Sequence, residues 1–156
     1  MKVKVTRDEK GFETFYEKKD CATIKSISIK HKKVPEKLSI EEIAARFHSG
    51  HYANTKDEPC LIECNFRDGT INSFEFPKDN VVYSSQFGIS VTQDGKFLFM
   101  QTWEDGLFCH ETRTGKLHWK SPIKKVRQIC LKDNVIVCNV DFEKTVTLSI
   151  NDGKRI

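Results

Sequence analysis

The sequence contains six cysteines and five histidines, the side chains that most often hold zinc in proteins. Cys60 and Cys64 fall on the same face of one expected strand, and Cys109 is followed by His110 in a later one. A zinc site would need four such ligands to converge, and no two cysteines are separated by two residues. Because inward-facing strand cysteines are common core residues, we expect no metal and no cofactor.

Two pairs of side chains could transfer protons, namely Glu104-Asp105 and His110-Glu111. The first pair falls in an expected turn and the second at the edge of an expected strand, where carboxylates are usually solvated. The sequence has no nucleophile elbow, phosphate-binding loop or glycine-rich dinucleotide motif. We therefore expect the protein not to be an enzyme.

Charge alternates along the chain although the net charge is only +4. Residues 1–40 carry eleven Lys/Arg against six Asp/Glu, residues 41–80 carry four against eight, and residues 121–156 carry seven against four. A nucleic-acid surface would gather its basic residues on one element and mix them with aromatic residues. The alternation therefore argues against a nucleic-acid partner.

Neither end of the sequence nor its interior suggests a membrane. Residues 1–20 lack the apolar segment of a secretory signal, and no later apolar run is long enough to cross a bilayer. The sequence therefore predicts a cytoplasmic protein without a membrane contact.

At 156 residues the chain is long enough for one domain with a substantial core. Lys2–Thr6 and Phe12–Tyr16 have the alternating pattern of a hairpin, and Ala22–Lys30 that of a further strand. We expect a single domain, 1–156, with N-terminal strands over 1–34, a helix over 39–48 and a repeat-containing β region over 60–156.

The expected helix has a clear beginning and end. Ser39 is followed three positions later by Glu42, which is a capping-box pattern. Ile40, Ile43 and Phe47 then fall at helical spacing before Ser49-Gly50 ends the run. A short amphipathic helix of this kind usually packs on its own domain.

A stretch of short strands and turns recurs in the second half of the chain. Val91–Trp119 pairs without gaps with the residues from Ile129 onward, at an offset of 38, so that Gly115 meets Gly153. A weaker third copy begins at Cys60, where an offset of 37 places Asp68-Gly69 on Asp105-Gly106. A period near 38 with about four short strands is typical of a propeller blade.

Within this stretch, QDGKFLFMQTWEDGLFCHETRTGKLHW resembles the repeat of the quinoprotein-like (PQQ-like) β-propellers, D-G-x-L-Y-A-x-D-x-x-T-G-x-x-x-W. The residues that match are Asp105, Gly106, Thr114, Gly115 and Trp119, with one residue fewer after Gly106. The resemblance implies that Thr114-Gly115 closes a hairpin and that Trp119 docks onto the neighbouring blade. Cofactor sites of this family are assembled from many blades, so we carry no cofactor binding over to any residue.

These patterns predict an all-β protein of about three to four propeller-like blades with one short helix, in a ring that is incomplete or completed by a second chain. An open sheet edge can accept a partner strand, so we expect a non-enzymatic protein–protein interaction module, with homodimer formation as one way to close the ring. If exposed beside such an edge, Trp103, Phe108 and Phe142 are the candidate partner-binding residues.

Two alternatives remain open. A small cytosolic inhibitor, such as an immunity protein to a bacterial toxin, would carry a cluster of acidic residues on one exposed face to match a basic toxin. A hydrolase with dispersed catalytic residues would instead bring His110 and a carboxylate together in a pocket.

Overall fold

The computed structural model describes residues 3–8, 11–31, 60–76, 90–101, 106–140 and 144–156. Every element in these ranges is a β-strand, and within them no helix is present that could span a membrane. The helix expected over 39–48 lies outside the described residues. The described part of the chain is thus all-β, as the alternating sequence pattern predicts.

Sheet 1 contains five antiparallel strands in chain order. The strand expected at Ala22–Lys30 is β3, and it pairs on one side with β2 and on the other with β4. The N-terminal hairpin is present as β1 and β2. The strands are β1 (Val3–Asp8), β2 (Gly11–Glu17), β3 (Ile24–His31), β4 (Cys60–Phe66) and β5 (Ile71–Phe76).

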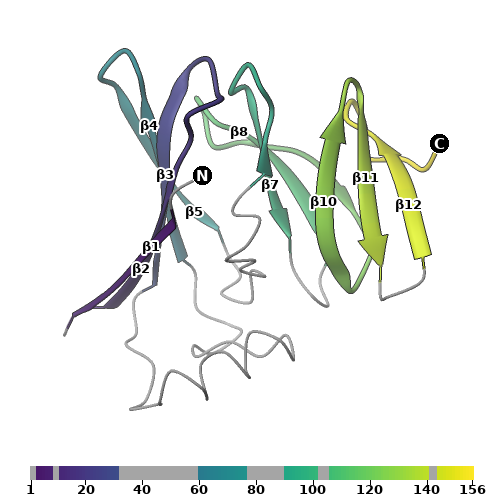
Figure 1. Ribbon diagram of the computed structural model, residues 1–156, viewed down its shortest axis with the longest axis horizontal. Helices are drawn as coiled ribbons and strands as arrows, with labels where there is room; N and C mark the ends of the chain where they lie inside the picture. The colour runs from purple at the N-terminus through teal and green to yellow at the C-terminus, as the bar shows by residue number, and fades with distance from the viewer. Residues whose placement is uncertain (1–2, 9–10, 32–59, 77–89, 102–105, 141–143) are drawn as a thin grey trace.

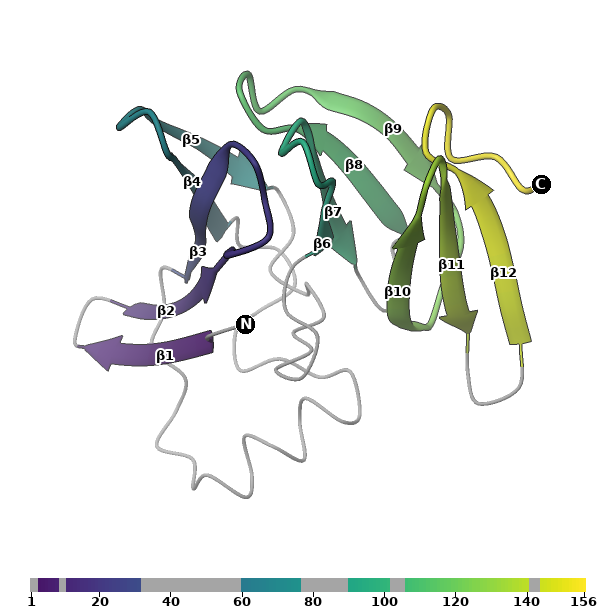
Figure 2. The same ribbon diagram turned by 45° about the horizontal axis from the view of Figure 1, so that its top comes forward.

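Two smaller antiparallel sheets follow, and Figures 1 and 2 show sheet 2 between sheet 1 and sheet 3. Sheet 2 consists of β6 (Ser90–Val91), β7 (Phe97–Gln101), β8 (Leu107–Glu111) and β9 (Leu117–Ser121). Sheet 3 consists of β10 (Val126–Lys132), β11 (Val135–Val140) and β12 (Lys144–Ser149). The three sheets resemble consecutive blades of a β-propeller, and the described residues do not form a closed ring.

Sheet 2 is apolar on both faces because it packs between two cores. Leu98, Met100 and Phe108 belong to the core shared with sheet 1, whereas Phe99 and Leu107 belong to the core shared with sheet 3. A strand buried on both faces needs apolar residues at successive positions rather than at alternate ones. This explains the continuous runs in β7 and β8.

The repeat read from the sequence is present in the hydrogen bonds. Gly115 N–H donates to Glu111 O over 2.8 Å, and 38 positions later Gly153 N–H donates to Ser149 O over 2.9 Å. The same offset relates the bonds from Thr112 N to Lys96 O and from Ile150 N to Asn134 O, and the pairs His110–Leu117 and Leu148–Arg155. β7 to β9 of sheet 2 therefore correspond to β11, β12 and the residues after it.

The third copy has a different alignment from the one expected at an offset of 37. Phe66 N–H donates to Thr70 O over 2.9 Å, as Glu111 N–H donates to Lys116 O. The last three strands of sheet 1, β3 to β5, therefore correspond to β7, β8 and β9. The turn at Gly69 corresponds to the turn at Gly115, which is one residue longer. The sequence alignment was wrong because it paired Gly69, which follows β4, with Gly106, which precedes β8.

Candidate interaction surface

The described turns within sheets 1, 2 and 3, together with the turn after β12, lie at one end of the molecule, at the top of Figure 1. Four of them are closed in the same way around a glycine of positive φ. The side-chain oxygen of the residue before the glycine accepts a hydrogen bond from the backbone N–H of the residue after the glycine. These bonds run from Thr70 to Asp68, Lys96 to Asp94 and Lys154 to Asp152, each over 2.9 Å, and from Lys116 to Thr114 over 3.2 Å.

Asp68, Asp94 and Asp152 are therefore engaged in their own turns. Hydrogen bonds from the Thr70 hydroxyl and N–H hold the pKa of Asp68 below its usual range. The Thr92 hydroxyl and the Lys96 N–H do the same for Asp94. Carboxylates held ionised in this way stabilise turns and are poorly suited to donate a proton.

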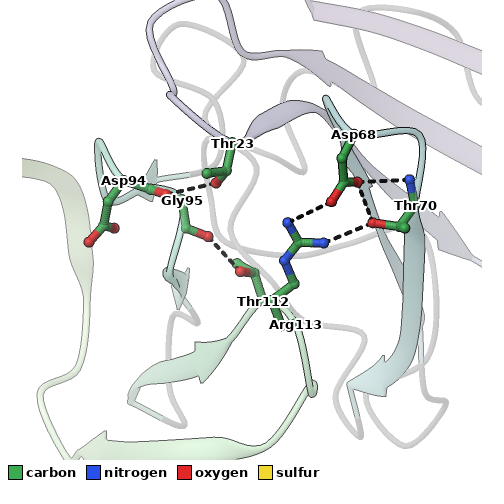
Figure 3. Close-up of polar contacts among 7 residues, drawn as sticks. All are labelled: Thr23, Asp68, Thr70, Asp94, Gly95, Thr112 and Arg113. Carbon is green, nitrogen blue, oxygen red and sulfur yellow. Dashed lines mark hydrogen bonds and ion pairs between the residues drawn. The ribbon is translucent and has the colours of Figure 1, made fainter.

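Polar contacts between neighbouring turns hold sheets 1 and 2 together, as Figure 3 shows. The Arg113 guanidinium donates to Thr70 Oγ1 over 2.8 Å and contacts Asp68 Oδ2 at 3.1 Å. Thr23 Oγ1 also donates to Asp94 O over 2.7 Å, between the two sheets. The bond from Thr112 Oγ1 to Gly95 O joins two turns within sheet 2. The turn end is consequently a fixed surface built from two sheets.

A hollow of about 370 Å³ opens beside this surface. Its walls come from the segment after β2, from β6 and the turn after it, and from β10, so the hollow lies where the first strands of the blades approach one another. Burial lowers the pKa of Lys18 in its wall, and the nearby Cys21 acts in the opposite direction. The lining residues are Glu17, Lys18, Lys19, Asp20, Cys21, Val91, Thr92, Gln93 and Leu131.

Two of the cysteines considered as zinc ligands, Cys64 and Cys109, do not converge. Cys64 lies in the core between sheets 1 and 2, and Cys109 lies in the core between sheets 2 and 3. Burial raises the pKa of each thiol to about 12, so both are protonated. No cluster of metal-binding side chains occurs in the part of the chain that the structure describes.

His110 is a core residue between two sheets. Its ring stacks on Phe74 and meets the edge of Phe76, and its Nδ1 lies 3.2 Å from Gly115 O. Its Nε2 is buried without a hydrogen-bond partner among the described residues. The neighbouring Glu111 accepts a hydrogen bond from Thr114 instead, so these residues do not form an acid–base pair.

The candidate partner-binding residues have two different outcomes. Trp103 and Phe142 lie outside the described residues. Phe108 is only 8% exposed, and its ring meets the edge of Phe76 in the core between sheets 1 and 2. The exposure that would make a residue a partner contact is therefore absent at Phe108, because sheet 2 buries both of its faces.

The residues assigned to the repeat lie at the contacts between sheets. Trp119 is buried, its Nε1 donates to Ile150 O over 2.6 Å, and its ring covers Gly153 of sheet 3. Gly106 and Gly115 have positive φ angles, and Thr114 closes the turn before Gly115. Asp105 lies outside the described residues.

One feature of this surface was missed from the sequence, namely the outer face of sheet 1 with the turn at Gly69. The alternation of polar Ser26 and Ser28 with apolar Ile27 and Ile29 in β3 was the available signal. It indicates a sheet with one apolar and one polar face.

Comparisons with known proteins find similarity among solved structures only. No family model matches the chain, and no curated protein matches it. Among solved structures, BamB from Moraxella catarrhalis is similar to 62% of this chain, with a TM-score of 0.48 and 14% identity. The chain spans 28% of the length of that protein.

Proposed function

We propose that this chain is a non-enzymatic protein–protein interaction module built on propeller-like repeats. The observation that carries the proposal is that the reactive side chains of the copy that best matches the repeat pattern, residues 91–119, are used in packing and turn closure. Cys109, His110 and Trp119 are buried between sheets, and Glu111 accepts a hydrogen bond from Thr114. The surfaces that remain for a partner are the turn end and the outer faces of sheets 1 and 3.

The turn end supports this proposal through its rigidity. The sheets meet there through side-chain hydrogen bonds, and the turns of positive φ are closed by their own side chains. A surface that is ordered before it binds loses little conformational entropy in the complex.

Site-specific photo-cross-linking in cells tests the proposal. A photoreactive amino acid at the exposed Gln93 of the turn end or Ser73 of β5 should give a discrete cross-linked product with a partner protein. The same amino acid at the exposed Thr145, at the start of β12 away from the turn end, serves as the control. Identical results at all three positions would contradict the proposal.

A second candidate function is inhibition of a basic protein, such as a toxin bound by an immunity protein. The observation that favours it is an acidic outer face of sheet 1, to which Glu13, Glu17, Glu63 and Glu75 contribute. Lysine substitutions at Glu13 and Glu75 should weaken inhibition of the basic toxin when its activity is titrated with this protein. Inhibition that is unchanged by both substitutions would exclude this surface.

A further inference from the structure

Two glycines of the repeat are covered by an aromatic ring from the preceding sheet. A Cβ atom placed on Gly115 would lie 2.6 Å from the Cβ of Phe74 in β5. A Cβ atom placed on Gly153 would lie 2.4 Å from Cε3 of Trp119 in β9. The last strand of each sheet therefore places a ring on the glycine turn of the next sheet.

A side-chain hydrogen bond accompanies each of these contacts. Asn72 Nδ2 in β5 donates to Thr112 O over 2.9 Å, and Trp119 Nε1 in β9 donates to Ile150 O over 2.6 Å. Thr112 and Ile150 are equivalent residues, each directly after the third strand of its blade. In each contact between sheets, the last strand of one sheet thus packs an aromatic ring on a glycine of the next sheet. The same strand donates a side-chain hydrogen bond to a nearby backbone carbonyl of that next sheet.

Sheet 1 has an equivalent turn, one residue shorter, whose glycine is not covered by a ring. Gly69 is the equivalent of Gly115, its φ is +89°, and no atom lies within 4 Å of a Cβ placed on it. Arg113 fixes the flanking Asp68 and Thr70 from the side of sheet 2. We call the space over Gly69, between these two residues, the Gly69 socket.

Gly115 and Gly153 are each covered from the preceding sheet, so by the same geometry the Gly69 socket belongs to the outer face of sheet 1, which is acidic. Over β2 to β5 this face consists of three cross-strand rows, in which four glutamates outnumber one lysine, Lys30, which is paired with Glu63 at 3.2 Å. The register of β1 adds Lys4 beside Phe15 on the same face. The rows are Glu13, Lys30, Leu61 and Glu75; Phe15, Ser28, Glu63 and Ser73; and Glu17, Ser26, Asn65 and Ile71.

This outer face differs from the face that sheet 2 turns toward sheet 1. At the positions equivalent to the pairs Leu98–His110 and Met100–Phe108, sheet 1 has Ser26–Asn65 and Ser28–Glu63. Ser26 and Ser28 are themselves buried, at 5% and 2% exposure, whereas the charged Glu63 would be costly to bury against an apolar sheet. The outer face therefore suits a partner with polar, basic side chains better than another propeller blade.

A second copy of this chain does not supply the missing ring through the outer face of its sheet 3. Among the described residues that face contains no aromatic side chain and one lysine. Its rows are Gln128, Asn139 and Thr145; Cys130, Val137 and Thr147; and Lys132, Val135 and Ser149.

We infer that the outer face of sheet 1 docks a β-strand of a partner protein that carries one aromatic side chain flanked by basic residues. The aromatic ring covers Gly69, a donor beside it bonds the carbonyl of Arg67, and the basic side chains face the glutamates. This inference rests on the proposed function and names the chemistry of the partner. The chain itself shows such a strand, since Lys116 and Lys120 flank Trp119 in and beside β9.

A labelled peptide with the sequence of residues 114–122 is the probe, and its binding is followed by fluorescence anisotropy and by amide chemical shifts. We expect saturable binding at millimolar concentration or below, with shifts at Gly69 and Ile71. Replacing the peptide's tryptophan with alanine should weaken binding about tenfold. Failure to bind, or equal binding of the alanine peptide, would overturn the inference.

Two protein variants locate the site. Gly69→Asn places a side chain in the Gly69 socket at a φ that asparagine tolerates, and it should weaken binding about tenfold. Glu75→Gln should weaken binding about twofold at low salt, whereas the equal charge change Asp133→Asn in sheet 3 should not. Unchanged affinity in Gly69→Asn would reject the socket, and a dimeric mass that Gly69→Asn abolishes would show that the occupant is a second copy.

The outcomes separate this inference from the proposed function. A cross-linked partner at Gln93 with no peptide binding at Gly69 would reject the Gly69 socket alone. Absence of position-dependent cross-links would contradict the interaction module itself.

Discussion

At the scale of single residues, Trp119 has the most demanding role in the described chain. Its indole packs near Phe99, covers Gly153 and donates to Ile150 O. One side chain thus contributes apolar burial, a close ring–backbone contact and a buried hydrogen bond. Its loss should affect the contact between sheets 2 and 3 as a whole.

Trp119→Ala should lower the free energy of unfolding by about 3 to 5 kcal/mol, as truncation of a buried aromatic side chain does. Trp119→Phe keeps a ring but loses the donor to Ile150 O, so its cost should be smaller, about 1 to 3 kcal/mol. Chemical denaturation measures both. A midpoint unchanged by Trp119→Ala would count against the blade assignment.

His110 should make stability depend on pH. Burial lowers its pKa, an effect that the hydrogen bond to Gly115 opposes only in part. The folded protein therefore binds fewer protons than the unfolded chain, and stability is lost as pH falls below the ordinary histidine value of about 6.5. Melting temperatures should fall from about pH 7.5 to about pH 5.5.

Two variants assign this pH dependence. His110→Phe should reduce it, because the ring remains between Phe74 and Phe76 without a titrating group. His118→Gln changes an exposed histidine stacked on Phe97 and should leave most of it. If both variants keep the wild-type slope, His110 is not its source.

At the scale of elements, the glycine turns connect local backbone conformation to the packing of whole sheets. Gly69, Gly115 and Gly153 have φ angles of +89°, +74° and +72°, respectively. Only the last two are covered by a ring. The three turns therefore have the same positive-φ backbone conformation, but only two of them have an aromatic ring packed against the glycine.

Gly153→Ala and Gly115→Ala should each destabilise the protein more than Gly69→Ala. All three place alanine in the left-handed region, which costs about 1 to 2 kcal/mol. The first two also force Cβ into Trp119 or Phe74, and overpacking adds about 1 to 3 kcal/mol. Equal losses in all three, measured by urea denaturation, would show that the rings are not held against the turns.

At the scale of the whole molecule, three sheets are stacked with two cores between them, and the outer sheets differ from the middle one. Sheet 2 is apolar on both faces, whereas the outer face of sheet 1 carries four glutamates. A ring closed by self-association would place this acidic face against the outer face of sheet 3, whose described residues include one lysine and no aromatic side chain.

Light scattering at micromolar concentration should accordingly give the mass of one 18.0-kDa chain. The reason is the poor match of charge and shape between the outer faces of sheets 1 and 3. A dimer that persists at high salt would contradict this expectation and would indicate closure of the ring by a second chain.

The sequence by itself determined the strand-rich class, the period of 38 and the glycine turns, because alternation and turn chemistry are local properties. It also indicated Trp119 through its place in the repeat. It did not determine the alignment of the third copy, since Asp68-Gly69 resembles Asp105-Gly106 in composition and only the hydrogen bonds of Phe66 show that its counterpart is the turn at Gly115.

Only the tertiary structure decided which faces are covered. The sequence shows that Phe108 is part of a strongly apolar strand. It is buried because sheet 1 lies against this face of sheet 2. The empty Gly69 socket is visible only by comparison with its filled counterparts, because an open space over a glycine has no local sequence signal. Sheet order and contacts between sheets join residues far apart in the chain, and local patterns do not encode them.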